Sequence, residues 1–135
     1  QFMKGWDHYG ELNSVQLLPK VTLVQTGRPD YVYRGKEIQK DYDEAEHGLA
    51  EARRFAADGV DLLVLDEINV ALDYGLLKLE DVMALVKSKP RDMELVLTGR
   101  NAAKELLELA DLVTEMREVK HPYQKGVKAR RGVEY

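Results

Sequence analysis

The sequence LLVLDE at residues 62–67 decides the fold, because four apolar residues lead directly into two adjacent carboxylates. A continuous apolar run of this length indicates a strand buried on both faces, as in a parallel sheet covered by helices. Shorter runs follow at residues 21–24 (VTLV) and 95–97 (LVL), and a fourth begins at residues 112–113 (LV). We therefore expect short strands that lie side by side in a mainly parallel sheet.

Helical periodicity fills the segments between these runs. Apolar residues recur at steps of three and four along residues 42–56, 79–86 and 102–110, as on the buried stripe of an amphipathic helix. A shorter helix is expected over residues 11–18. The alternation of strands and helices predicts an α/β fold, with the sheet flanked by helices in one domain that spans residues 1–135.

Composition and charge exclude several classes of protein. The chain is 44% hydrophobic and 33% charged, which is typical of a globular protein rather than a disordered or fibrous one. No apolar run approaches the roughly 20 residues that cross a bilayer, and no secretory signal pattern is visible. The absence of cysteine excludes disulfides and thiolate metal sites and is consistent with the cytoplasm. A formal net charge of −4 argues against a general nucleic-acid binder.

Polar side chains follow two of the apolar runs at the point where each strand should end. Asp66 and Glu67 follow one run, and Thr98 follows another. Ligands of open parallel sheets bind beyond these carboxyl ends. Buried carboxylates are costly unless they are compensated, and a divalent cation near phosphates compensates them in the acidic strand end called Walker B. The alternative is an acidic junction in which Asp66 or Glu67 caps a helix that starts near Asn69.

Each of three other features has two possible interpretations. Arg100 either pairs with a phosphate through its guanidinium fork or forms an ordinary salt bridge. Tyr31 and Tyr33 either stack on a planar ligand or pack on the rim of the domain. Lys125 and Lys128 belong to a basic tail on an acidic protein, which either attracts polyphosphate or is simply solvated.

The phosphate-binding loop of nucleotide-binding proteins, Gly-x-x-x-x-Gly-Lys-[Ser/Thr], does not occur in the sequence. The chain opens with Gln1, and residues 1–3 (QFM) are typical of the end of a buried strand entered partway along. We therefore expect that further residues precede Gln1.

Together these segments resemble the CobA/BtuR-type corrinoid adenosyltransferases. The strongest match is residues 112–123 (LVTEMREVKHPY), continued by residues 132–135 (GVEY). Further matches are residues 65–69 (LDEIN), 97–100 (LTGR) and 1–5 (QFMKG), so the resemblance covers essentially the whole chain. It implies a RecA-like P-loop fold whose first strand and P-loop precede this chain, and a homodimer.

The resemblance also implies a reaction. Enzymes of this family transfer the 5′-deoxyadenosyl group of ATP to the Co(I) of a corrinoid such as cobalamin and release triphosphate, so the substrate itself is the nucleophile. Mg²⁺ or Mn²⁺ neutralises the leaving triphosphate. By the resemblance, Asp66 and Glu67 are the catalytic carboxylates that hold this metal, and Thr98, Arg100 and Asn69 line the ATP side.

Trp6, Tyr31 and Tyr33 fall on the corrinoid side of the resemblance. Well-known members carry a Phe-x-Trp pair under the corrin ring, and the nearest match here is Tyr31-Val32-Tyr33. These rings would displace the lower axial ligand of Co(II) cobalamin and ease its reduction by an electron-donating flavoprotein reductase. Lys125 and Lys128 would bind phosphate or close over the site.

Two other functions agree with part of the sequence. A generic RecA-like ATPase would use the Asp66-Glu67 pair and Thr98 equally well. A non-catalytic corrinoid-binding fragment would need no P-loop. The specific match at residues 112–123 favours the adenosyltransferase.

Overall fold

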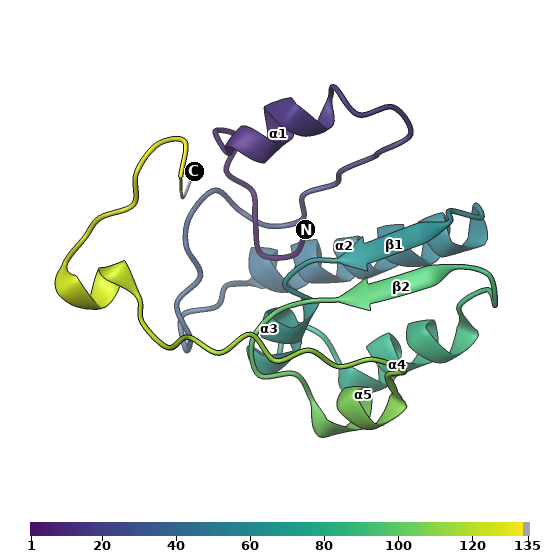
Figure 1. Cartoon of the computed structure of the whole chain (residues 1–135). Helices are drawn as coiled ribbons and strands as arrows, with labels where there is room; N and C mark the ends of the chain where they lie inside the picture. Colours follow the sequence, from purple (N-terminus) through teal and green to yellow (C-terminus); the bar gives the residue numbers. More distant parts are fainter. Residues whose placement is uncertain (134–135) are drawn as a thin grey trace. The chain divides into compact units, whose positions relative to one another are not determined.

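The computed structural model describes residues 1–133, which fall into two compact units (Figure 1). The first unit contains Gln1–Trp6 and Val24–Leu109, and the second contains Asp7–Leu23 and the residues from Ala110 onward. The last two residues of the GVEY match lie outside the described part of the chain. The prediction of one domain over residues 1–135 stays a prediction.

A pair of parallel strands forms the centre of the first unit, as the apolar runs predict. Strand β1 (Leu62–Leu65) pairs with β2 (Glu94–Leu97), with Leu62 opposite Glu94 and Leu65 opposite Leu97. Helices α3 (Ile68–Asp73) and α4 (Leu79–Ser88) form the crossover between them, which parallel neighbours require because a tight turn cannot join them. The α/β class and the parallel pairing are thereby confirmed.

The N-terminal stretch extends this pairing on the free edge of β1. The Phe2 amide donates to the Asp66 carbonyl at 2.9 Å, and the Met3 amide donates to the Thr26 carbonyl at 2.8 Å. The Thr26 amide donates back to the Gln1 carbonyl at 2.8 Å, which makes Phe2 and Thr26 a parallel bridge. The strand predicted at residues 21–24 is therefore wrong in position, because the pairing involves residues 24–26.

Helices pack the core against one face of the strands. Helix α2 (Gln39–Ala57) presents small apolar residues to this face, and its C-terminal end is followed by Gly59 with a φ of 80°. Burying each large aliphatic side chain stabilises the fold by roughly 1.5–3 kcal/mol. The helices predicted at residues 42–56 and 79–86 are confirmed as α2 and α4. The core brings together Phe2, Ala45, Leu49, Ala52, Ala56, Leu65, Ile68, Val82, Leu85 and Met93.

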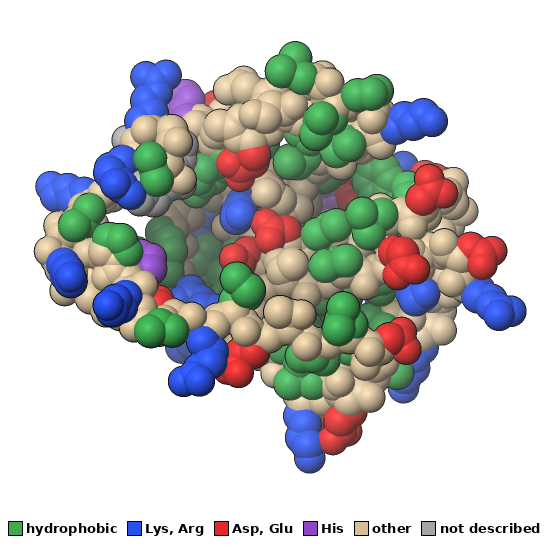
Figure 2. All heavy atoms as spheres, viewed as in Figure 1, with side chains coloured by type: hydrophobic (Ala, Val, Ile, Leu, Met, Phe, Trp, Pro, Cys, Tyr) green, Lys and Arg blue, Asp and Glu red, His purple; other side chains and the backbone are tan. Residues whose placement is uncertain are grey.

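The opposite face of the two strands is exposed, contrary to the prediction of burial on both faces. Successive side chains of a strand point to opposite faces, and Leu62 and Val64 on the outward face are 56% and 47% exposed. Val96 beside them is 42% exposed. Figure 2 shows apolar side chains over the strands in the view of Figure 1. In the described part of the chain, helices cover only the face that carries Leu65.

The strand predicted at residues 112–113 is also wrong. Within residues 1–133 this segment pairs with no other strand, and Leu112 is 84% exposed. An unpaired strand lacks partners for its backbone groups and is not stable alone. The helices predicted at residues 11–18 and 102–110 form over shorter ranges, as α1 (Gly10–Val15) and α5 (Lys104–Leu109).

The remaining element is the short 3₁₀ helix η1 (Pro122–Lys125) in the second unit. None of the helices that the structure describes combines the length and the apolar character that crossing a membrane requires.

Candidate functional site

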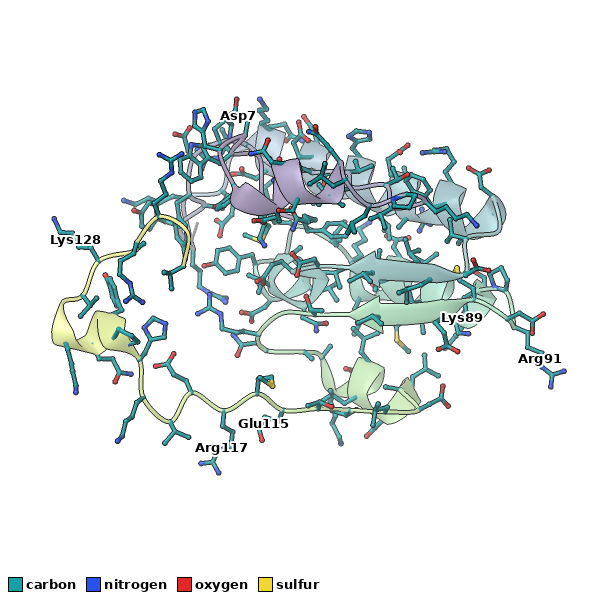
Figure 3. The ribbon with its side chains drawn as sticks, turned by 45° about the horizontal axis from the view of Figure 1, so that its top comes forward. Asp7, Lys89, Arg91, Glu115, Arg117 and Lys128 are labelled. Carbon is teal, nitrogen blue, oxygen red and sulfur yellow. The ribbon has the colours of Figure 1, made fainter. Side chains whose placement is uncertain are left out.

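The polar residues predicted at the strand ends meet at the carboxyl end of the sheet. The amino end is marked by Lys89 and Arg91, which project from the turn before β2 (Figure 3). At the other end the parallel register sets Leu65 beside Leu97, so the residues that follow each strand are neighbours. The Thr98 hydroxyl donates to Asp66 Oδ1 at 2.8 Å and accepts from the Glu67 amide at 3.1 Å. Thr98 therefore joins the two strand ends.

Lys4 completes this group and was missed from the sequence. Its Nζ donates to Asp66 Oδ2 at 2.9 Å, and each of the two side chains is 29% exposed. Partial burial acts to raise the pKa of Asp66, but the hydrogen bonds from Lys4 and Thr98 outweigh it and lower the pKa below its usual value. Lys4 follows the residues that pair beside β1, and this position is the signal that could have identified it.

The backbone after β1 turns sharply to start α3. Glu67 adopts a left-handed conformation, with a φ of 64°, at the N-cap, and its side chain makes no capping hydrogen bond. Both Asp66 oxygens bond elsewhere. The alternative in which one of these acids caps the helix therefore does not apply to α3.

Asn69 is buried beneath the same strand ends. Its backbone amide donates to the Thr98 carbonyl at 3.1 Å, while its side-chain Oδ1 has no hydrogen-bond partner among the described residues. Gly99 packs over it with a φ of 121°, and a Cβ at Gly99 would lie 3.1 Å from the Asn69 Cβ. A side chain at position 99 would therefore strain the backbone and crowd Asn69.

The carboxylates fit a metal that is shared with a phosphate ligand. Within residues 1–133 no group of three or more His, Cys, Asp or Glu side chains is arranged to hold a metal. Mg²⁺, however, commonly binds through one or two carboxylates and completes its shell with water and substrate phosphates. Asp66 retains acceptor capacity beyond its two hydrogen bonds, and Glu67 is its neighbour. The chemistry of these donors is therefore suitable for a metal–phosphate ligand.

Tyr31 and Tyr33 form an exposed aromatic pair. Their ring centroids lie 4.9 Å apart with the planes at 64°, and the residues are 65% and 61% exposed. Val32 between them is buried, as the alternation of an extended chain requires. The pair therefore presents two ring systems to solvent instead of packing them into the rim.

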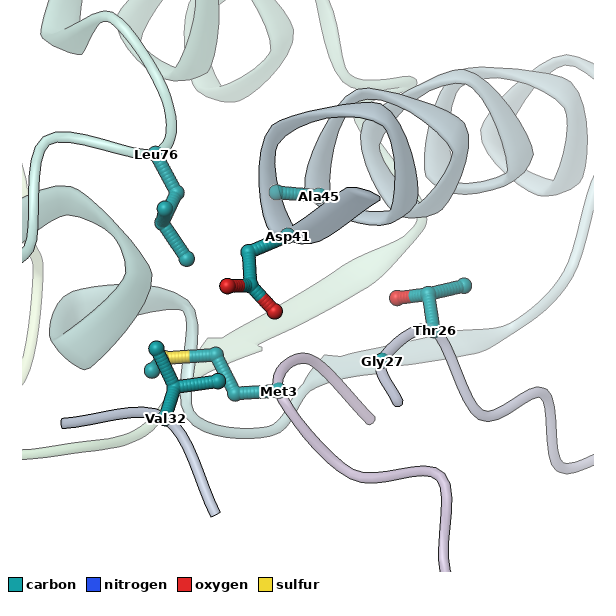
Figure 4. A pocket seen from close by; sticks show the side chains of 7 residues that line it. All are labelled: Met3, Thr26, Gly27, Val32, Asp41, Ala45 and Leu76. Atoms are coloured by element: carbon teal, nitrogen blue, oxygen red, sulfur yellow. The ribbon is translucent and has the colours of Figure 1, made fainter. Parts of the chain in front are cut away.

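The loop between Thr26 and α2, which carries the aromatic pair, is anchored at its base. The buried Asp41 carboxylate accepts from Arg28 Nε at 2.7 Å and from the Ile38 amide at 2.9 Å. Asp41, Val32 and Leu76 are among the residues that line a small cavity (Figure 4). Its volume is about 10 Å³, which has room for only one water molecule. This small cavity belongs to the anchor of the loop and is too small for a substrate.

A larger cavity, of about 150 Å³, lies between α3, the loop after β2 and Arg34. Arg34 forms an ion pair with the Asp73 carboxylate, donates to the Asp73 carbonyl at 3.0 Å, and lies 4.6 Å above the Tyr74 ring. Asn101 Nδ2 donates to the same carboxylate at 2.8 Å. Arg100 lines this cavity and makes no hydrogen bond to Asp66, Thr98 or Lys4, which we call the Asp66 cluster. We call the larger cavity the arginine cavity, lined by Arg34, Val70, Asp73, Tyr74, Arg100 and Asn101.

The other predicted site residues lie outside these two groups. Trp6 belongs to the first unit and is partly buried. Lys125 and Lys128 belong to the second unit, where both are exposed. The roles predicted for these three residues stay predictions.

Comparison with known proteins gives a consistent result. The family model described as "ATP:corrinoid adenosyltransferase BtuR/CobO/CobP" matches residues 1–135. A "Corrinoid adenosyltransferase" of Pseudomonas aeruginosa is 37% identical over 136 residues, which are 100% of this chain and 67% of that protein. One from Sinorhizobium sp. is 37% identical and one from Escherichia coli K12 is 32% identical, with all of this chain matched to 64% and 68% of those proteins. The chain thus spans about two thirds of the length of these relatives.

Proposed function

The chain belongs to the ATP:corrinoid adenosyltransferase family, and we propose that it positions ATP and a reduced corrinoid for transfer of the 5′-deoxyadenosyl group. The Co(I) electron pair attacks the ribose C5′, the cobalt–carbon bond forms, and the C5′–O bond breaks. Triphosphate leaves with the electrons of that bond. The observation that supports this assignment is the family match over the whole chain, joined to an Asp66-Thr98-Lys4 cluster at the ligand-binding end of a parallel sheet.

In this proposal the cluster organises the triphosphate end of ATP. Asp66 and Glu67 hold Mg²⁺ or Mn²⁺, which when bound neutralises the charge that develops on the leaving triphosphate. Thr98 fixes the Asp66 carboxylate, and Lys4 balances its charge before the substrate arrives. Asn69, whose buried Oδ1 lacks a partner among the described residues, would accept from a donor on the nucleoside.

The aromatic pair serves the corrinoid. Tyr31 and Tyr33 are exposed rings on an anchored loop, and they would lie under the lower face of the corrin. There they would exclude the lower axial ligand. With no ligand donating electron density to the cobalt from below, Co(II) would accept an electron more easily. Trp6 would lie on the same side. An electron-donating flavoprotein reductase would supply the electron.

We further propose the RecA-like P-loop fold and the homodimer of the family. The parallel strands with an acid at a carboxyl end support the fold, and family membership supports the homodimer. Lys125 and Lys128 would bind phosphate or close the site.

The test is an assay of the full-length protein with chemically reduced cobalamin and MgATP. Formation of adenosylcobalamin, together with triphosphate release, is expected. Replacing Asp66 by Asn should lower kcat by roughly 100-fold, the effect of losing one well-placed electrostatic group. Asp92→Asn, an exposed carboxylate in the turn before β2, is the matched control and should leave the rate unchanged.

Two other outcomes would contradict the proposal. Release of ADP and phosphate without a cobalt–carbon product would indicate a generic RecA-like ATPase. Tight corrinoid binding with no turnover of ATP would indicate a non-catalytic corrinoid-binding protein.

A further inference from the structure

The arginine cavity contains a positive charge that no neighbouring side chain fully balances. Arg34, Arg100 and Asp73 line it together with the neutral Tyr74 and Asn101. Two guanidinium groups thus face one carboxylate, and the excess is one positive charge. An excess of positive charge in a hollow of this kind attracts anions.

The two arginines differ in how far they are already engaged. Arg34 uses its terminal nitrogens on the carboxylate and carbonyl of Asp73 and stacks on Tyr74. Arg100 makes no hydrogen bond to any residue in the described part of the chain. Its charge helps to lower the pKa of Asp73, after the hydrogen bonds from Asn101 and Arg34. Asn101 is held by its own bond to Asp73. Arg34 and Asn101 are therefore held in place by their contacts with Asp73 and Tyr74. The guanidinium group of Arg100 has its hydrogen-bond donors available for a ligand.

We propose that the arginine cavity is an oxyanion subsite in which Arg100 is the main donor to a phosphate or carboxylate carried by a substrate. A guanidinium fork matches the geometry of these groups and binds them bidentately. The proposal rests on the proposed function, because it takes the two substrates as the sources of the anion. It adds a specificity site that is separate from the Asp66 cluster.

The position of the cavity is consistent with either substrate as the source. Arg34 directly follows Tyr33 of the aromatic pair, which favours a peripheral group of the corrinoid. Arg100 lies two residues beyond Thr98 at the end of β2, which favours the phosphates of ATP. The shared chemistry is an oxyanion, and binding measurements can separate the two sources.

The experiment measures the Kd of ATP, cobalamin and cobinamide for the wild-type protein and the variant Arg100→Gln. Cobalamin carries a phosphodiester that cobinamide lacks. The Kd of the anion-bearing substrate should rise about tenfold, as expected for the loss of a charge-assisted hydrogen bond. A rise for cobalamin alone assigns the anion to the corrinoid, and a rise for ATP alone assigns it to the nucleotide. Unchanged Kd values, or equal losses for cobalamin and cobinamide, would overturn the subsite.

Control variants separate binding from folding. Arg91→Gln removes another exposed arginine, from the opposite end of β2 (Figure 3), and should change none of the three Kd values. Arg100→Lys keeps the charge but loses the fork, so its effect should be intermediate. Unchanged thermal unfolding of Arg100→Gln would show that its fold is intact. A wild-type protein that binds neither substrate would contradict the proposed function as well, whereas unaltered binding by Arg100→Gln contradicts the subsite alone.

Discussion

At the scale of single residues, Asp66 has the most constrained environment in the candidate site. It is partly buried at the end of β1, yet its pKa is lowered, because Lys4 and Thr98 donate to its two oxygens. A partly buried carboxylate with both oxygens bonded in this way contributes to the stability of the fold as well as to its chemistry. The same contacts therefore make a prediction about pH.

The stability contributed by Asp66 should disappear in acid. Its folded pKa is lower than the unfolded value of about 3.9, so the contribution is fully present above that value and is lost as the pH falls through the folded pKa. Urea denaturation of the metal-free and nucleotide-free protein between pH 3 and pH 6 checks this. The difference in unfolding free energy between wild type and Asp66→Asn should shrink as the pH falls below about 4.

A variant of the partner provides the control for this pH effect. Lys4→Met removes the donor to Asp66 Oδ2, so the pH dependence attributed to Asp66 should be weaker in this background. A dependence of the same size with and without Lys4 would mean that this ion pair does not lower the pKa.

At the scale of elements, the loop between Thr26 and α2 combines a fixed base with an exposed tip. Asp41 and Arg28 hold the base, Val32 packs inward, and Arg34 ties the far side to α3. The exposed pair Tyr31 and Tyr33 is therefore held at a defined place by the contacts at the base and the far side of the loop. Such preorganisation is what a surface that contacts a rigid, planar substrate requires.

Replacing Tyr33 by Ala should separate the two steps of the proposed reaction. The variant should reduce Co(II) cobalamin more slowly, because the ring that would exclude the lower ligand is gone. Adenosylation of cobalamin that has already been reduced to Co(I) should be nearly unchanged. The two rates are measured by following cobalt reduction and cobalt–carbon bond formation spectroscopically.

The variant Tyr33→Phe keeps the ring and should behave as wild type in both assays. Equal loss of the two rates in Tyr33→Ala would show that the ring supports the transfer step itself, contrary to its proposed role in reduction.

At the scale of the whole molecule, the sequence predicts local patterns well and distant contacts poorly. The run at residues 62–65 is continuously apolar, and the stripes of α2 and α4 are periodic, so these elements follow from the sequence. Helix α3 has only six residues, which is too short for a periodic signal. The Lys4–Asp66 pair joins residues 62 positions apart, and only the position of Lys4 directly after the strand end expected at residues 1–3 could have indicated it. The strand predicted near Leu112 fails because an apolar dipeptide does not specify a partner strand.

The one-sided covering of the strands leads to a prediction about the core. Leu65 is 3% exposed and Val64 is 47% exposed, although they are neighbours in β1. Leu65→Ala should therefore lower the free energy of unfolding by about 2–5 kcal/mol, through lost burial and a cavity. Val64→Thr keeps a β-branched side chain in solvent and should change it by less than about 0.5 kcal/mol. Both are measured by urea denaturation of the full-length protein. A loss for Val64→Thr as large as that for Leu65→Ala would mean that the outward face is covered in solution, because a hydroxyl is costly only where water is excluded.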